Sequence, residues 1–201
     1  NMKKDNTVLM RMARQSLEGK WGVAIPTIFI YLLITGGLQG VIEAFPLASI
    51  VSLIVTGPLV LGIAGFALNI CRGKEAKIAQ LFQGFDNFFT STVAYILMLL
   101  FVFLWMILFI IPGLIAALSY SMTFFIIADD NSIDGFEALK KSKQMMKGYK
   151  WKYFCLNLRF LGWLVLCILS LGIGFLWLIP YVQVTNANFY EDIKDSALEN
   201  E

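Results

Sequence analysis

Polar side chains that stand alone inside apolar stretches are the first candidates for chemistry. Arg159 lies seven residues beyond Lys152, which on a helix places it about 10 Å further along the axis. A central arginine costs about 2.5–3.5 kcal/mol on membrane-insertion scales. Its side chain therefore either extends to a membrane interface or binds an anionic group, such as a lipid phosphate or the carboxylate of Asp129 or Asp130.

A second group of polar residues lies in the last apolar segment, where Gln183, Asn186 and Tyr190 share one helical face. Side chains of this kind commonly hydrogen-bond helices to each other, each for under about 2 kcal/mol. The alternative is a polar cleft that opens inward where the helices converge. The candidates for such a cleft are Arg159, Gln183, Asn186, Tyr190, Tyr120 and Asn69.

The residue types that enzymes use most are scarce. The sequence has no histidine, which is the commonest general base and metal ligand, and its three cysteines lack C-x-x-C spacing. Asp129, Asp130 and Asp134 form an acidic turn, but acids without a calcium-binding loop indicate helix capping and solvation rather than a cation site. We therefore expect no catalytic residues, no metal and no cofactor, and a protein that is not an enzyme.

The composition indicates a membrane protein. Hydrophobic residues make up 58% of the 201 residues and charged residues only 15%, and the mean hydropathy is +0.72. A soluble domain of this size could not bury so much apolar surface. We expect a single all-α integral membrane domain over residues 2–201.

Charge distribution sets the expected topology. Charged residues cluster at 3–20, 72–86, 129–152 and 191–201. Each apolar stretch between them is long enough for two helices, because one crossing takes about 20 residues. The positive-inside rule places the clusters and both termini in the cytoplasm. The sequence thus predicts about six transmembrane helices in three hairpins, at 22–40, 50–71, 91–110, 112–128, 153–170 and 174–190.

Turn-forming residues fit these pairs of helices. Thr56-Gly57-Pro58, Ile111-Pro112-Gly113 and Gly172-Ile173-Gly174 are predicted to interrupt the apolar runs. Pro180 either starts the last helix or bends it, because proline is tolerated only in the first turn without a kink.

An internal repeat is marked by Gly19, Gly84 and Gly148, which are spaced 65 and 64 residues apart. We expect each glycine to end an amphipathic cytoplasmic helix, which is followed by a transmembrane hairpin. Before Gly84, the helical stripe would consist of Ile78, Leu81, Phe82 and Phe85. The predicted units are 7–73, 76–131 and 134–193, and the first has extra length in its 37–50 loop. The alternative is that these segments are only polar linkers.

The third of these helices carries the strongest charge. Asp134 and Glu137 have the spacing of a capping box. Phe136, Leu139 and Met146 would lie on one side of the helix, with the lysines largely elsewhere. Basic residues on such helices face anionic headgroups. The candidate lipid-interface residues are Lys140, Lys141, Lys143, Lys147 and Trp151.

Several sequence strings resemble one family of bacterial membrane proteins. They are A-R-Q-S-L-E-G-K-W-G, I-P-G-L-I-A-A-L-S-Y-S-M, A-L-K-K-S-K-Q-M-M-K-G-Y-K-W-K and L-S-L-G-I-G-F-L-W-L-I-P-Y, together with N-F-Y-E-D. They resemble domain of unknown function 975, and the resemblance covers nearly the whole chain. That family is distantly similar to the membrane domain of glycerophosphodiester phosphodiesterases. The resemblance implies a cytoplasmic-membrane protein without an established activity and favours an envelope-related role.

These observations lead to two competing expectations. The first is a non-catalytic membrane module that binds anionic lipid headgroups, or a partner protein, through basic interfacial helices. The second is a small-solute or lipid transporter or channel, lined by Arg159, Gln183 and Asn186. Against it, the repeats are parallel and threefold, unlike the inverted pairs of many transporters. We expect no nucleic-acid partner.

Overall fold

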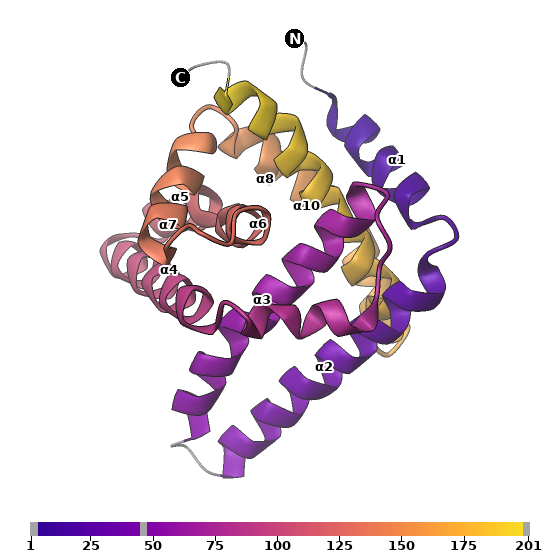
Figure 1. The fold of residues 1–201 in the computed structure, drawn as a ribbon, viewed down its shortest axis with the longest axis horizontal. Coiled ribbons are helices and arrows are strands. Elements are labelled where there is room, and N and C mark those ends of the chain that lie inside the picture. The colour runs from indigo at the N-terminus through magenta and orange to yellow at the C-terminus, as the bar shows by residue number, and fades with distance from the viewer. Residues whose placement is uncertain (1–3, 45–47, 199–201) are drawn as a thin grey trace.

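The computed structural model describes residues 4–44 and 48–198, and in these residues all regular structure is helical (Figure 1). This confirms the predicted all-α class. The α-helices are α1 (Asn6–Leu17), α2 (Trp21–Ala44), α3 (Ala48–Cys71), α4 (Phe88–Leu108), α5 (Ile110–Tyr120), α6 (Thr123–Asp129), α7 (Gly135–Met145), α8 (Lys150–Leu158), α9 (Leu161–Leu169) and α10 (Phe175–Leu198). Two short 3-10 helices, η1 (Ile78–Leu81) and η2 (Gln83–Phe85), connect α3 to α4.

Five helical segments of the described chain are long and apolar enough to span a membrane, as expected of a membrane protein. They are Trp21–Val41, Ser49–Cys71, Phe88–Ile107, Ile110–Asp129 and Lys150–Leu169. The last helix, α10, is 24 residues long but contains Gln183, Asn186 and Asn188, which lower its hydropathy. The predicted loop 37–50 is wrong in its described part, because α2 continues to Ala44 and α3 begins at Ala48. Residues 45–47 lie outside the described residues.

Two of the expected continuous spans are bent. The chain turns at Ser121–Met122 between α5 and α6, and again at Arg159–Phe160 between α8 and α9. At the first bend the fully buried Ser142 of α7 is inserted. Its hydroxyl donates to the carbonyl of Ser119 at 2.8 Å and accepts from the N–H of Met122 at 3.2 Å. A neighbouring helix thus satisfies the backbone groups that the bend frees.

Pro58 does not interrupt the chain, so the predicted turn at Thr56-Gly57-Pro58 is wrong. Helix α3 continues through Pro58. The neighbouring Gly57 allows close backbone contact with α4 rather than a turn. A Cβ on Gly57 would lie 2.7 Å from the carbonyl oxygen of Ser91 in α4. Pro180 likewise lies inside α10 rather than at its start.

Gly84 has a different role from the one predicted. Gly19 and Gly148 have positive φ angles of 76° and 88°, as expected after a helix C-terminus. Gly84 is buried in η2, where an added Cβ would lie 1.9 Å from the carbonyl oxygen of Pro58. A Cβ on Gly62 would lie equally close, at 1.9 Å, to the carbonyl oxygen of Leu81. The connecting segment therefore rests directly on the backbone of α3.

The predicted apolar helix before Gly84 is also wrong, because the segment forms two 3-10 turns. Leu81 is fully buried there, whereas Ile78, Phe82 and Phe85 are 37%, 46% and 36% exposed. The conformation of this segment is explained by its close backbone contact with α3 and not by an apolar helical stripe.

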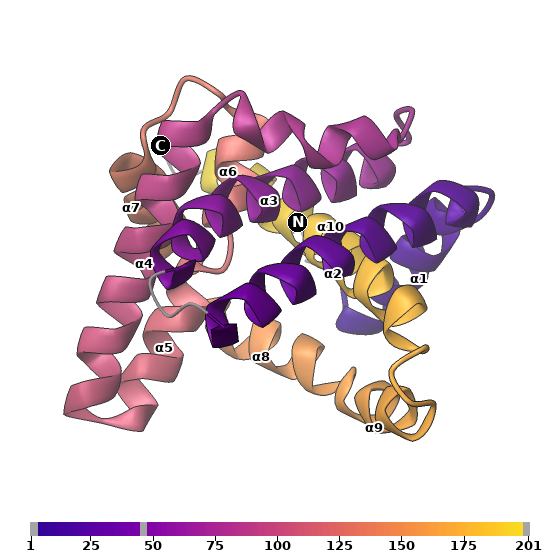
Figure 2. The same ribbon diagram turned by 90° about the horizontal axis from the view of Figure 1, so that it is seen from below.

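Each short segment packs against the helix pair that precedes it in the chain. The 3-10 turns contact α3 and α2, and α7 contacts α4, α5 and α6. The first segment, α1, contacts α10 and α8 at the other end of the sequence (Figures 1 and 2). The N-terminal helix α1 therefore packs against the C-terminal helix α10.

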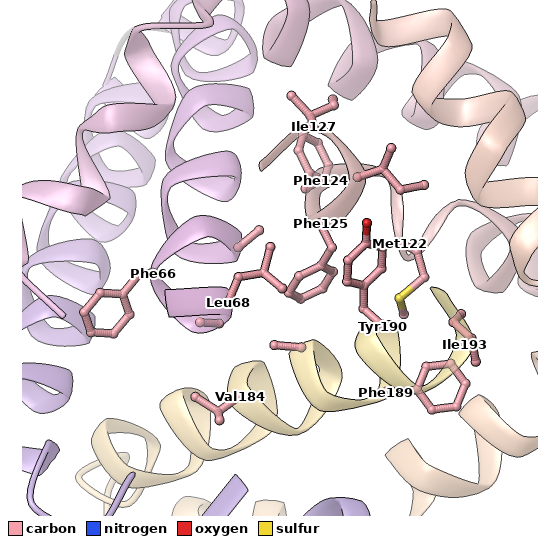
Figure 3. Packing of buried hydrophobic residues seen from close by; sticks show 14 of the residues in the cluster. Phe66, Leu68, Met122, Phe124, Phe125, Ile127, Val184, Phe189, Tyr190 and Ile193 are labelled. Carbon is pink, nitrogen blue, oxygen red and sulfur yellow. The ribbon is translucent and has the colours of Figure 1, made fainter. Parts of the chain in front are cut away.

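The buried core joins α1, α3, α6 and α10. The rings of Phe125 in α6 and Tyr190 in α10 stack with their centroids 5.9 Å apart (Figure 3). Away from this core the α4–α5 pair and the α9 end point in different directions (Figure 2). Their surfaces are apolar and exposed: Ile111 is 71% exposed and Leu171 94%. Such surfaces need a lipid or protein environment.

The glycine contacts on α3 give a stability prediction. Gly62→Ala and Gly84→Ala should destabilise the protein by about 1–3 kcal/mol or more, because each Cβ would overlap backbone atoms. The control is Gly36→Ala in α2, where a Cβ meets nothing within 4 Å. It should be neutral or stabilising by up to about 1 kcal/mol. Thermal unfolding in detergent measures the stability of the three variants. Equal stability of Gly36→Ala and the other two would contradict the close packing at Gly62 and Gly84.

Candidate functional site

The ends of three helices meet in a cluster of ion pairs. Arg72 directly follows α3, Asp129 is the last residue of α6 and Glu191 lies in α10. Arg72 Nη2 is 2.5 Å from Asp129 Oδ1 and 2.6 Å from Glu191 Oε1. Arg72 Nε also donates to Glu191 Oε1 at 2.9 Å. One guanidinium therefore joins residues from three segments that are far apart in the sequence.

Two further residues of α10 complete the partners of Asp129. The Tyr190 hydroxyl donates to Asp129 Oδ2 at 3.0 Å, and the Lys194 ammonium pairs with the same oxygen. The side chain of Asp129 is only 14% exposed, against 26% for Arg72. Burial favours the neutral form of Arg72, but its hydrogen bonds to Asp129 and Glu191 outweigh burial and raise its pKa.

The charges in this cluster cancel, because two cations face two carboxylates. Each carboxylate is already bound by a cation, so the arrangement offers no free general base. It is suited to fixing the helix ends relative to each other. We define Arg72, Asp129, Tyr190, Glu191 and Lys194 as the ion-pair cluster.

A second set of polar contacts ties α1 to the same region. Lys152 Nζ is 3.0 Å from Asp192 Oδ2, and the Asp192 side chain is 6% exposed. The backbone N–H of Lys4 donates to Asp192 Oδ1 at 3.3 Å. Asn6 Nδ2 donates to the carbonyl of Lys152 at 3.1 Å. Thus α1, α8 and α10 are linked beside the ion-pair cluster.

The residues proposed for a polar cleft occupy separate environments. Tyr120 is buried beside Phe101, with ring centroids 5.9 Å apart. Gln183 lines a cavity of about 310 Å³ between α9 and α10. Asn186 is 8% exposed, and its Oδ1 has no hydrogen-bond partner among the described residues. Asn69 is half-buried near the end of α3.

Arg159 lies at the bend after α8, and its side chain is exposed. Asp129, one of its two candidate carboxylate partners, is bound by Arg72 and Lys194 instead. The other candidate, Asp130, bonds to Ser132, whose hydroxyl donates to Asp130 Oδ1 at 2.5 Å. These hydrogen bonds hold the pKa of Asp130 below its usual value. The pairing suggested for Arg159 is therefore replaced by these contacts.

The basic face of α7 is the other candidate site. Asp134 caps the helix by accepting from the N–H of Glu137 at 2.8 Å, which confirms the capping expected there. Leu139 and Met146 are buried whereas Phe136 is 59% exposed, so the three residues predicted to lie on one side of the helix do not share one environment. The candidate interface residues are all exposed: Lys140, Lys141, Lys143, Lys147 and Trp151.

Phe136 and Trp151 add exposed apolar surface in the same part of the sequence as these lysines. Trp151 is 74% exposed and stacks on Phe154, with ring centroids 5.5 Å apart. Within the described side chains, none of the four lysines forms an ion pair. We define Lys140, Lys141, Lys143, Lys147, Phe136 and Trp151 as the basic face.

The model of the family described as "Protein of unknown function (DUF975)" matches residues 2–119 and 106–197. The chain belongs to this family. No curated protein and no solved structure matches the chain. The predicted family is thereby confirmed, and any function has to be argued from the geometry.

Sequence reasoning missed the ion-pair cluster. Its signal was present in the repeat, because Arg72, Asp129 and Glu191 each stand at the cytoplasmic end expected for the second helix of a unit. Alignment of those ends would have brought the three charges together. In the sequence these residues fall in three separate charged clusters, and Asp129 belongs to an acidic turn.

A double-mutant cycle tests the cluster. Arg72→Gln and Asp129→Asn should each destabilise the protein, and their coupling free energy should fall within about 0.5–3 kcal/mol, because the pair is largely buried. The control pair is Lys77–Glu75, whose side chains are 63% and 78% exposed. Its coupling should stay below about 1 kcal/mol. Chemical or thermal unfolding supplies the values, and equal coupling in both pairs would refute the assignment.

Proposed function

We propose that this protein is a non-catalytic, multi-pass protein of the bacterial inner membrane that binds anionic lipid headgroups at its cytoplasmic surface, in an envelope-related role. The observation that carries the proposal is the basic face, where four exposed lysines have no ion-pair partner among the described side chains. Elsewhere Arg72, Lys152 and Lys194 are matched with carboxylates. Four such lysines within eight consecutive residues favour an external anion at this surface.

The physical chemistry of the basic face supports a membrane as the source of that anion. Each lysine near an anionic leaflet contributes about 1 kcal/mol of attraction. Exposed aromatic side chains prefer the headgroup region, where an apolar ring and a polar edge are both accommodated. Trp151, four residues after Lys147 and 74% exposed, supplies such a ring, and Phe136, 59% exposed, adds apolar surface one helical turn before Lys140. A soluble acidic partner would leave these aromatics without a comparable environment, although a partner protein is an alternative occupant.

The proposal includes six crossings in three hairpins, with α10 as the sixth. Thr185, Asn186 and Asn188 of α10 are buried in the fold, so its low hydropathy does not reflect the surface that it offers to lipid. Packing of each short segment on the preceding helix pair, with α1 on α10, supports three related units. In this arrangement both termini and the basic face lie in the cytoplasm.

Transport is the less favoured alternative. A transporter needs its polar residues around one route, whereas Tyr120 and Tyr190 lie in different aromatic contacts and Arg159 is on the outside. Tyr190 also donates to Asp129 and belongs to the ion-pair cluster. The geometry therefore favours binding at the surface.

Charge reversal tests the lipid assignment. The variant Lys140→Glu, Lys141→Glu and Lys143→Glu should weaken the preference for anionic over zwitterionic phospholipid around the protein, because attraction at the basic face becomes repulsion. Energy transfer from tryptophan to dansyl-labelled phosphatidylglycerol or phosphatidylcholine in mixed vesicles measures this preference. The control replaces the same three lysines with arginine and should retain it. An unchanged preference after charge reversal would exclude the basic face as the site.

Cysteine labelling tests the proposed topology. In a chain whose native cysteines are replaced by alanine, Lys143→Cys should react with an impermeant maleimide only in inside-out vesicles. Ile173→Cys, in the exposed turn before α10, should react in intact cells. Labelling of both positions from the same side would contradict the hairpin arrangement.

A further inference from the structure

We propose that the cavity where α1, the start of α2, α9 and α10 meet binds one anionic phospholipid of the surrounding bilayer. The cavity has a volume of about 520 Å³, within the range of about 300–1,000 Å³ typical of small-molecule sites. It is separate from the basic face, and none of the α7 residues lines it. The site goes beyond headgroup attraction, because it would hold a single lipid molecule in a defined place.

Arg14 supplies the charge for the phosphate. Its side chain lines the cavity and forms no ion pair with a described side chain, Glu18 on the same turn included. A guanidinium presents several donors in a fixed plane that matches two phosphate oxygens at once. The uncompensated charge at an otherwise apolar cavity therefore selects an anionic headgroup.

The apolar part of the wall fits an acyl chain. Three of the five tryptophans of the protein, Trp21, Trp163 and Trp177, line the cavity together with Leu166. Trp163 and Trp177 are 55% and 48% exposed, so large aromatic surfaces are open to an occupant. Tryptophan suits a bound lipid, because its ring contacts hydrocarbon while its indole N–H binds a headgroup or ester oxygen.

The charged group of the cavity lining is a cation, and the neutral polar groups beside it are hydrogen-bond donors. The cavity lining includes no Asp or Glu, and the hydroxyl of Ser170 already donates to the carbonyl of Cys167 at 2.9 Å. The remaining polar groups are the guanidinium, the indole N–H groups and the hydroxyl of Tyr181. A lining rich in donors and without a carboxylate complements phosphate and ester oxygens, which accept hydrogen bonds only.

Native mass spectrometry of the detergent-purified full chain tests the proposal directly. With phosphatidylglycerol added, the wild-type protein should retain one phospholipid. Arg14→Gln should weaken retention by about tenfold or more, because hydrogen bonds to a charged group are lost. The matched control is Arg11→Gln, which removes another exposed arginine charge from the same helix, outside the cavity. Equal retention in the two variants, or no retained lipid in the wild type, would overturn the proposal.

Two comparisons separate the phospholipid from other occupants. Glycerol phosphate, which has the headgroup chemistry but no acyl chain, should fail to displace the lipid. Displacement at similar concentrations would show a site for a free phosphate compound and contradict the proposal. Phosphatidylcholine should bind more weakly than phosphatidylglycerol, and equal binding of the two would also contradict it.

A spectroscopic readout locates the acyl chain. In a Trp105→Phe, Trp151→Phe background, phospholipid with brominated acyl chains should quench the three remaining tryptophans at low lipid-to-protein ratio. Arg14→Gln should shift that quenching to higher ratios, whereas charge reversal on α7 should leave it unchanged. This last comparison distinguishes the cavity from the basic face, so either assignment can fail without the other.

Discussion

The arrangement of the helices depends on the hydrogen bonds and charges that Arg72 brings together. Its guanidinium binds Asp129 from α6 and Glu191 from α10 while the chain itself leaves α3 at the adjoining Cys71. A partly buried arginine is unfavourable without partners, so the three helix ends must stay in contact once one of them is in place. Tyr190 and Lys194 add further contacts to the same carboxylate. The stacked Phe125 and Tyr190 rings continue this junction into the apolar core.

Fixed ends on one side allow the helix pairs to separate on the other. The α4–α5 turn and the α9–α10 turn expose residues such as Ile111 and Leu171, which need a lipid or protein environment. In the proposed membrane arrangement lipid would fill the space between the pairs, and the cavity lined by Arg14 would be one such place. The helix pairs thus diverge from a polar junction, and the basic face and this cavity lie on different parts of that arrangement.

The sequence predicted those parts of the structure that depend on periodicity and composition. The apolar stretches, the cap at Asp134 and the exposure of the α7 lysines follow from local patterns. Local patterns could not reveal that Gly62 and Gly84 touch backbone across segments, so Pro58 was interpreted as a turn. They also could not reveal Ser142 in the bend after α5 or the distant partners of Arg72. These features arise from tertiary contacts, which periodicity does not encode.

The central claim is that a polar junction at the membrane surface holds diverging helix pairs within the bilayer. A structure determined in nanodiscs that contain phosphatidylglycerol tests this claim most directly. The account predicts Arg72, Asp129 and Glu191 at headgroup depth, on the same side as the α7 lysines, with hydrocarbon between the helix pairs. The same three side chains at the bilayer midplane, around a water-filled passage with the α7 lysines away from the headgroups, would contradict it.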